Sequence, residues 1–369
     1  MDAVGIVNIS YKEYEVEGLS DYRPISSISF LGRYRIIDFQ LSNFSNSEIN
    51  NVMIEANQHV KSLADHVGTG RNYNINTKHS RLSIFYPTNN GSDIYRHDIN
   101  ALKNSLRALK MSKENYVIIV PGHTVLSIDY RTYLKEHISS KADISVIYKK
   151  IDNANEKFIG IPKYAINPQQ GLEEIMTNHG SKDVANISLE TYIMEKALLI
   201  KILESKRLNS AVYWLKDAIN QMAKSKEFDI RCLEYKGFYE NINSLKAYYD
   251  ANMVLLDPLT RKQAFKDEWP IYTKTHDSEP VLYCNGSKVE NSLISNACHI
   301  CGKVKNSILS RNVSIEKGAI IDGCIILSDC YISENTVLKN VIIDRYAKVL
   351  YTKEIVNDNL TYIKRDDII

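Results

Sequence analysis

Short apolar runs recur along the first part of the chain and alternate with stretches of helical spacing. Residues 3–9, 51–56 and 116–120 are mostly apolar and rich in β-branched side chains, which is typical of buried strands. Between the last two runs, apolar residues recur at three- and four-residue intervals, as in a helix that covers a sheet: Ile99, Leu102, Leu106 and Leu109. The alternation predicts an α/β domain with a mostly parallel sheet.

The pattern changes at residue 309, where the sequence divides into successive six-residue units. The units are LSRNVS, IEKGAI, IDGCII, LSDCYI and SENTVL. Most units begin with an aliphatic residue and carry a small or apolar residue at the fifth position. Because each sixth residue of a triangular coil returns to the same inward position, the period predicts a β-helix. The exposed edges of such coils often assemble subunits.

The length of 369 residues is enough for two or three domains. We predict an α/β domain over residues 1–256 and a β-helix domain over residues 281–369. Residues 257–280 hold three prolines and show no strong periodicity, so we predict that they form a linker.

Composition argues against several classes of function. A net charge of +2 is too small for a dedicated nucleic-acid or anionic-membrane binder. No run is long enough to span a bilayer, and the N-terminus lacks the layout of a signal peptide. The cysteines are scattered, and the C-x-x-C of Cys298 and Cys301 has no second pair at zinc-finger spacing. We therefore expect a cytoplasmic protein with reduced, structural thiols rather than a metal site or disulfides.

Residues 32–49, GRYRIIDFQLSNFSNSEI, form the densest unusual stretch of the chain. A Gly leads into Arg33 and Arg35, then into an apolar-periodic run and a cluster of Ser and Asn, which predicts a loop that enters a helix. Basic residues before a helix start are well placed to meet an anion, because the first helical N–H groups lack partners there. A solvated basic loop is the alternative interpretation.

Ligands of parallel α/β sheets bind at the carboxyl ends of the strands. Residues 8–11, Gly122 and His123 are therefore the expected pocket edges. A phosphate-binding loop would be Gly-rich, because only Gly lets backbone N–H groups close on phosphates. Residues 10–17, SYKEYEVE, have no Gly and three acids, so this loop is poorly suited to a triphosphate.

Several motifs, in order, resemble the bacterial glucose-1-phosphate adenylyltransferase (ADP-glucose pyrophosphorylase) family over nearly the whole length. Residues 32–49 resemble G-x-Y-R-(I/L)-I-D-F-P-L-S-N-C-x-N-S-x-I, residues 117–130 resemble I-L-S-G-D-H-I-Y-x-M-D-Y, and residues 237–256 resemble G-Y-W-x-D-V-G-T-I-x-S-Y-W-E-A-N-M-x-L-L. The resemblance implies a Rossmann-like nucleotidyltransferase domain of the GT-A type, followed by a left-handed β-helix of hexapeptide repeats. It also implies the family reaction of glycogen biosynthesis, in which ATP and glucose 1-phosphate give ADP-glucose and pyrophosphate with Mg²⁺.

The chain departs from the family pattern at positions that carry the chemistry. The metal-binding Asp that follows Ser-Gly in the family falls on His123, and the second metal Asp falls on Asn241. The family's sugar-phosphate Lys falls near Asn178. Mg²⁺ prefers carboxylate oxygens, for which an imidazole and an amide are poor replacements. We therefore expect no tightly bound cofactor, no set of metal ligands, and little or no catalysis by the chain alone.

This combination resembles the D-type regulatory subunit of bacterial glycogen biosynthesis, which accompanies a catalytic subunit. The resemblance implies a hetero-oligomer, expected to be a tetramer, and an allosteric pocket for a phosphorylated effector or a nucleotide. Three basic residues match family positions at that pocket: Arg23, Arg35 and Arg345. Guanidinium groups suit phosphate because they offer paired donors. The alternative is that these arginines pair with local acids such as Asp38 or Asp344.

Residues 91–93 partly resemble the family's sugar-nucleotide loop. Gly91, Ser92 and Asp93, together with Gly122, are expected to form a residual sugar-nucleotide pocket that binds without turnover. Asp129 is expected to cap a helix rather than to bind a ligand.

Two other functions stay open. One is an active nucleotidyltransferase that makes ADP-glucose or another nucleotide sugar with a rearranged metal site near His123, Glu240 and Asn241. In a strand over residues 239–241, however, Glu240 and Asn241 would point to opposite faces. The other is a β-helix acyltransferase, which would need His299 as its catalytic histidine.

Overall fold

The structure, a computed structural model, describes residues 1–9, 14, 16–56, 59–75, 81–86, 97–205 and 214–369. The chain divides into two compact units. The first unit comprises Met1–Glu13, Phe39–Tyr239 and Asp267–Tyr272, and the second comprises Tyr14–Asp38, Glu240–Lys266 and Thr273–Ile369. Each unit therefore joins segments that are distant in sequence. The domain limits inferred from the sequence stay predictions.

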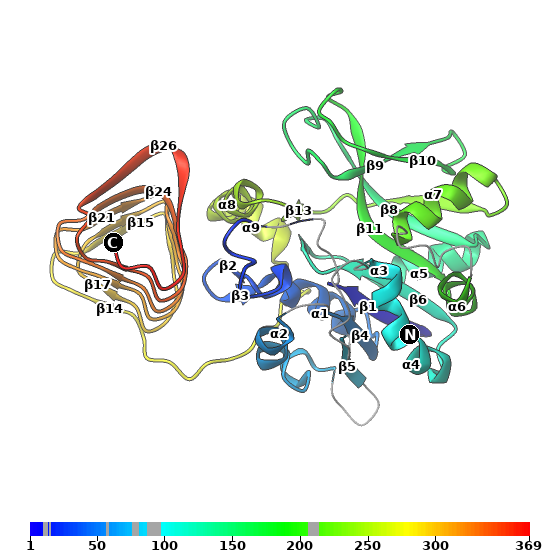
Figure 1. Ribbon diagram of the computed structural model, residues 1–369, viewed down its shortest axis with the longest axis horizontal. Coiled ribbons are helices and arrows are strands. Elements are labelled where there is room, and N and C mark those ends of the chain that lie inside the picture. The colour runs from blue at the N-terminus through cyan, green and yellow to red at the C-terminus, as the bar shows by residue number, and fades with distance from the viewer. Residues whose placement is uncertain (10–13, 15, 57–58, 76–80, 87–96, 206–213) are drawn as a thin grey trace. The chain divides into compact units, whose positions relative to one another are not determined.

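The first unit is built on a mixed sheet (Figure 1). Its strands are β1 (Ala3–Asn8), β4 (Asn51–Glu55), β5 (Arg81–Phe85), β6 (Tyr116–Pro121), β8 (Ile144–Ile151), β9 (Pro162–Ile166), β10 (Leu172–Thr177), β11 (Ala185–Glu195) and β12 (Ile230–Glu234). β1 lies parallel to β4 and β6, and β4 lies parallel to β5. β11 runs antiparallel to β6, β8 and β9. β12 lies parallel to β8, whereas β10 runs antiparallel to β9. The expectation of a mostly parallel sheet thus holds for β1, β4, β5 and β6 and for the β8–β12 pair, but not for the pairs of β9, β10 and β11, because strand–helix alternation does not fix the direction of every strand.

Several helices accompany this sheet, and four of them share one apolar core with it. They include α1 (Ile36–Asn46), which begins in the second unit, α2 (Val60–Val67), α3 (Asp98–Leu102), α4 (Leu106–Met111), α5 (Tyr130–Ser140), α6 (Lys196–Glu204) and α7 (Leu215–Ser225). Alternate residues of β1 and β6 join α3, α4, α6 and α7 in the core, as the two-residue period of a strand requires. The single helix predicted across residues 99–109 is divided by a 3-10 turn, where Ser105 Oγ donates to the Leu102 carbonyl at 3.0 Å and competes with a helical hydrogen bond.

The C-terminal part of the second unit is a β-helix, drawn in yellow to red in Figure 1. One sheet stacks β14 (Leu282–Tyr283), β17 (His299–Ile300), β20 (Ser314–Ile315), β23 (Tyr331–Ile332) and β25 (Lys348–Val349). The other holds β15 (Lys288–Glu290), β16 (Leu293–Ile294), β18 (Lys303–Lys305), β19 (Ile308–Leu309), β21 (Ile320–Asp322), β22 (Ile325–Ile326), β24 (Val337–Ile343) and β26 (Glu354–Ile363).

The inward positions of the coils are those that the six-residue period indicates. Neighbouring coils pair in parallel. The aliphatic residues that open successive six-residue units are all buried: Leu309, Ile315, Ile321 and Leu327. Parallel stacking around one apolar core fits the left-handed β-helix expected from the repeats.

The rest of the second unit consists of short strands and helices. β2 (Ser29–Phe30) pairs with β3 (Tyr34–Arg35), and α8 (Leu245–Met253) is followed by α9 (Pro258–Ala264). α9 lies inside the segment predicted as a linker, where Asp257 accepts a hydrogen bond from Thr260 N and Pro258 opens the helix. The segment predicted as a linker therefore begins with a capped helix, which the weak periodicity of its apolar residues did not indicate.

Two cysteines depart from the expectation of free thiols. Cys284 and Cys301 form a disulfide, whereas Cys232, Cys298, Cys324 and Cys330 are free and buried. The C-x-x-C motif therefore does not pair with itself. Within the part of the chain that the structure describes, no helix has the length and apolar character needed to cross a membrane.

Candidate functional site

The carboxyl ends of β1 and β6 come together as the parallel sheet predicts. Gly122 N donates to the Asn8 carbonyl at 3.0 Å, and His123 follows directly. Both Asn8 and His123 line a cavity of about 10 Å³, together with Asp98, Glu190, Lys216 and neighbouring strand residues. That volume is roughly what a single water molecule needs. As far as the described residues line it, the strand-end cavity therefore has room for about one water molecule.

His123 is held in this cavity by buried polar groups. Its side chain is 3% exposed, and its Nε2 lies 3.5 Å from Glu190 Oε1. Glu190 lies in β11 with a φ of 49°, within the register shift between Ser188 and Thr191. This irregularity re-aims the strand's side chains next to the cavity.

Asp98 is the second buried acid of the strand-end cavity. It opens α3 and accepts hydrogen bonds from Leu215 N at 2.8 Å and from Asn8 Nδ2 at 3.4 Å. Burial raises the pKa of the Asp98 carboxyl to about 7, and the nearby Glu190 adds to the rise. A carboxyl that holds a proton near neutral pH is a hydrogen-bonding partner rather than a strong cation ligand.

The cavity does not fit Mg²⁺. This ion prefers carboxylate oxygens in octahedral geometry at 2.0–2.1 Å, and His123 and Asn241 supply none at the two positions that match the family's metal ligands. Asp98, His123 and Glu190 all line this cavity, but among the described residues their ligand atoms do not form a group within 4.8 Å of one another. Asn241, which matches the second metal position of the family, is buried at the end of β13 (Tyr239–Asn241), and Glu240 before it is half-buried. The segment is thus a strand, as the sequence argument about opposite faces assumed.

Other predicted site positions have structural tasks or lie outside the described residues. Asn178 Nδ2 donates to the carbonyls of Ala154, Lys157 and Phe158, so its side chain organises a loop. Asp129 accepts from Arg131 N at 2.9 Å and caps α5, as expected. Gly91, Ser92 and Asp93 lie outside the described residues.

The arginines expected at an effector pocket are engaged with acids. Arg23 is 5% exposed, and its Nη2 donates to both carboxylate oxygens of Asp344 at 2.7 Å. Arg345 Nη2 donates to Asp329 at 3.0 Å. For Arg35, the backbone N–H donates to Asp38 Oδ2 at 2.9 Å. The ion-pair alternative therefore describes the contacts of Arg23 and Arg345, with Asp329 as an acid that the sequence analysis did not name.

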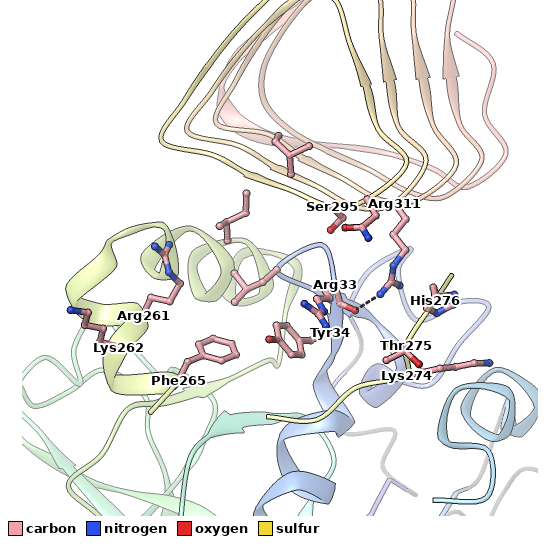
Figure 2. A pocket seen from close by; sticks show the side chains of 14 residues that line it. Arg33, Tyr34, Arg261, Lys262, Phe265, Lys274, Thr275, His276, Ser295 and Arg311 are labelled. Atoms are coloured by element: carbon pink, nitrogen blue, oxygen red, sulfur yellow. Dashed lines mark hydrogen bonds between the residues drawn. The ribbon is translucent and has the colours of Figure 1, made fainter. Parts of the chain in front are cut away.

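A larger pocket, of about 560 Å³, lies within the second unit (Figure 2). We call it the basic pocket, because its lining side chains include Arg33, Arg261, Lys262, Lys274, His276 and Arg311. No acidic side chain is among the described residues that line it. Five lysine and arginine charges without a lining acid favour an anionic ligand.

Aromatic rings and a close pair of cations shape this pocket. The Tyr34 and Phe265 rings lie with centroids 5.2 Å apart. Arg311 Nη2 donates to the Arg33 carbonyl at 3.4 Å, the contact dashed in Figure 2. Burial, and then the Arg33 charge, lower the pKa of the Arg311 guanidinium, as expected where cations crowd. An anion bound here would relieve that repulsion.

Sequence reasoning missed most of these residues. Arg33 lies in the stretch first noticed, but Arg261, Lys274 and Arg311 come from three other segments without any shared spacing. Asp98 and Glu190 were missed for the same reason, since only the fold brings them to His123.

Comparison with known proteins agrees with the fold. A family described as nucleotidyl transferase matches residues 17–258, and one described as GlmU-like, C-terminal hexapeptide matches residues 282–364. The glycogen biosynthesis protein GlgD of Geobacillus stearothermophilus is 32% identical over 86% of this chain and 82% of its own length. The protein of the same name from Bacillus subtilis is 29% identical over 85% and 81%. The glucose-1-phosphate adenylyltransferase of Fervidobacterium nodosum is 23% identical over 100% and 92%. The chain therefore belongs to the nucleotidyl transferases of the glucose-1-phosphate adenylyltransferase family, and it resembles their GlgD-type members.

Proposed function

We propose that this chain is a regulatory, catalytically weak or inactive subunit of glucose-1-phosphate adenylyltransferase in glycogen biosynthesis. It would modulate a catalytic partner subunit that converts ATP and glucose 1-phosphate to ADP-glucose and pyrophosphate. The observation that carries the proposal is the side chains at the family's two metal positions, where buried His123 and Asn241 stand in place of Asp. The 32% identity to a GlgD protein supports it.

Replacement of the family's metal ligands would make the chain a poor catalyst. Phosphoryl and nucleotidyl transfer depend on positioning and on neutralisation of charge, much of which Mg²⁺ supplies. His123 and Asn241 offer no carboxylate, and burial raises the pKa of the Asp98 carboxyl to about 7, which weakens it as a cation ligand at neutral pH. We propose that the chain binds no Mg²⁺ tightly. Because the reaction's substrates are phosphorylated metabolites, we also propose that the protein is cytoplasmic.

The basic pocket is the proposed allosteric site. Its cations suit a phosphorylated effector or a nucleotide, and the Tyr34 and Phe265 rings suit an apolar or aromatic part of the same ligand. Arg23 and Arg345 hold ion pairs instead, so we assign the effector contacts to Arg33 and Arg311. Arg35, the last residue of β3, stays a candidate.

Co-expression with a catalytic glucose-1-phosphate adenylyltransferase subunit tests the proposed partnership. We expect a hetero-oligomer, of tetrameric mass, whose response to anionic effectors differs from that of the catalytic subunit alone. Native mass spectrometry and effector titration measure both properties. Two separate proteins with unchanged effector response would contradict the proposal.

An active nucleotidyltransferase with a rearranged site is the second candidate. The observation in its favour is that Glu190 brings a carboxylate to His123. The test measures Mn²⁺ binding to the chain at saturating ATP by electron paramagnetic resonance. Mn²⁺ binding that the Glu190→Gln variant loses would support this second candidate.

A further inference from the structure

Three soft metal-binding side chains meet at the first coils of the β-helix. Parallel pairing sets Leu282 opposite His299 and Tyr283 opposite Ile300. The next residues, Cys284 and Cys301, therefore occupy the same position on successive coils, with their Cα atoms 4.7 Å apart. His299 Nε2 lies 3.3 Å from Cys284 Sγ and 3.5 Å from Cys301 Sγ. All three side chains are half-buried.

The fold, and not a local motif, makes this cluster. His299 and Cys301 point to the same side of their strand, because they are two residues apart and Ile300 between them is buried. Cys298, the first cysteine of the C-x-x-C, is buried, and its Sγ donates to the Ser310 carbonyl at 3.0 Å. The partner of Cys301 is Cys284, a full coil earlier, which spacing arguments did not consider.

The geometry suits zinc. Thiolate and imidazole ligands select Zn²⁺ over hard cations such as Mg²⁺. In a tetrahedral site with sulfur at about 2.3 Å and nitrogen at about 2.0 Å, those two atoms lie about 3.5 Å apart. The two sulfur–nitrogen separations of 3.3 and 3.5 Å match that value.

We propose that, in the reduced chain, Cys284, His299 and Cys301 bind one Zn²⁺ as two thiolates and one imidazole, with water in the fourth position. The disulfide is the oxidised form of the same cluster. A dithiol reductant of the thioredoxin class donates two electrons and two protons to the S–S bond, giving two thiols, and itself becomes a disulfide. Zn²⁺ then replaces the two thiol protons, which pass to water. Zinc and disulfide exclude each other.

The site would fasten the open end of the β-helix. β14 is the first strand of its sheet, and its Leu282 is 62% exposed, so little apolar burial holds the terminal coil. Solenoids need such terminal coils to be protected. A metal that joins Cys284 to Cys301 ties the first coil to the second. This inference is independent of the proposed regulatory function.

The test uses the full chain, reduced and kept without oxygen. Zn²⁺ is titrated in competition with a chromophoric chelator, and Co²⁺ is added separately as a spectroscopic probe. We expect one Zn²⁺ per chain and the visible absorption of tetrahedral Co²⁺ with thiolate ligands. The Cys284→Ser/Cys301→Ser variant should bind Zn²⁺ more than about 100-fold more weakly, since loss of even outer-shell partners costs 10–100-fold.

Cys298→Ser is the matched control, because its thiol lies one residue from His299 but is buried in the coil core. It should leave the Zn²⁺ affinity within about threefold of the wild-type value, well below the loss expected for a ligand. The Co²⁺ spectrum of the wild-type chain keeps the test valid if a variant fails to fold. Reduced wild-type chain that binds no Zn²⁺, or equal binding by the double variant, would overturn the proposal.

Discussion

The buried pair of Arg23 and Asp344 can be tested as a structural element. Arg23→Met removes the cation and leaves the Asp344 carboxylate with two donors, the Arg345 backbone N–H at 2.7 Å and the Tyr362 hydroxyl at 3.0 Å. Removing one partner of a buried ion pair costs about 3–5 kcal/mol. Because two donors remain, we expect a loss near the lower end, about 3 kcal/mol, in the free energy of unfolding of the second unit.

Hydrogen exchange of peptides across β24 and β26 measures this loss, since these strands carry Asp344's neighbours and Tyr362. A loss of about 3 kcal/mol speeds exchange by about 100-fold. In the double variant with Asp344→Asn, no charge is left unpaired, so the loss should be smaller than the sum of the two single losses. An exchange rate that Arg23→Met changes less than about threefold, equivalent to about 0.6 kcal/mol, would refute this structural role. A fall in effector affinity in the same variant would instead indicate that Arg23 contacts the effector.

Three further predictions concern other parts of the two units. Burial raises the pKa of the Glu55 carboxyl to about 8, so the folded chain keeps a proton that the unfolded chain loses above about pH 4.5. The free energy of unfolding should therefore fall by about 3 kcal/mol between pH 5 and pH 8. Urea unfolding, monitored by tryptophan fluorescence, measures this slope, and Glu55→Gln should flatten it. Arg311→Ala should weaken inorganic pyrophosphate binding about 10-fold in calorimetry, whereas Arg365→Ala, outside the basic pocket, should not; equal effects would contradict the assignment. Gly32→Ala should destabilise the second unit by more than about 1 kcal/mol in hydrogen exchange, because φ is +71° and the new Cβ would lie 2.7 Å from the Leu309 carbonyl oxygen; an unchanged exchange rate would contradict this.

The β-helix could be predicted because its signal is local. Each coil repeats the same inward positions, so the six-residue spacing alone predicts that Ile315 and Ile321 are buried. β1 and β6 were predictable for a similar reason, since strands buried on both faces are apolar throughout. The direction of β11 was not, because it depends on pairing with β6 and β8, which are far away in the sequence.

The candidate sites also differ in whether their signal is local in the sequence. The replacement of a metal-binding Asp by His123 can be read from a motif, since the surrounding residues fix the position. The basic pocket cannot, because Arg33, Arg261 and Arg311 meet only after the second unit has folded. The C-x-x-C motif misled for a physical reason: two residues three apart in this coil point to opposite sides, and the coil repeat supplies the real partner.

Steady-state turnover of the purified chain tests the central claim most directly. ADP-glucose formation is measured with saturating ATP, glucose 1-phosphate and Mg²⁺, for the chain alone and beside a catalytic subunit at equal concentration. We predict turnover by the chain at least about 100-fold below that of the catalytic subunit, because metal stabilisation of the transition state is worth several kcal/mol. Comparable turnover, lost in a His123→Ala variant, would contradict the account.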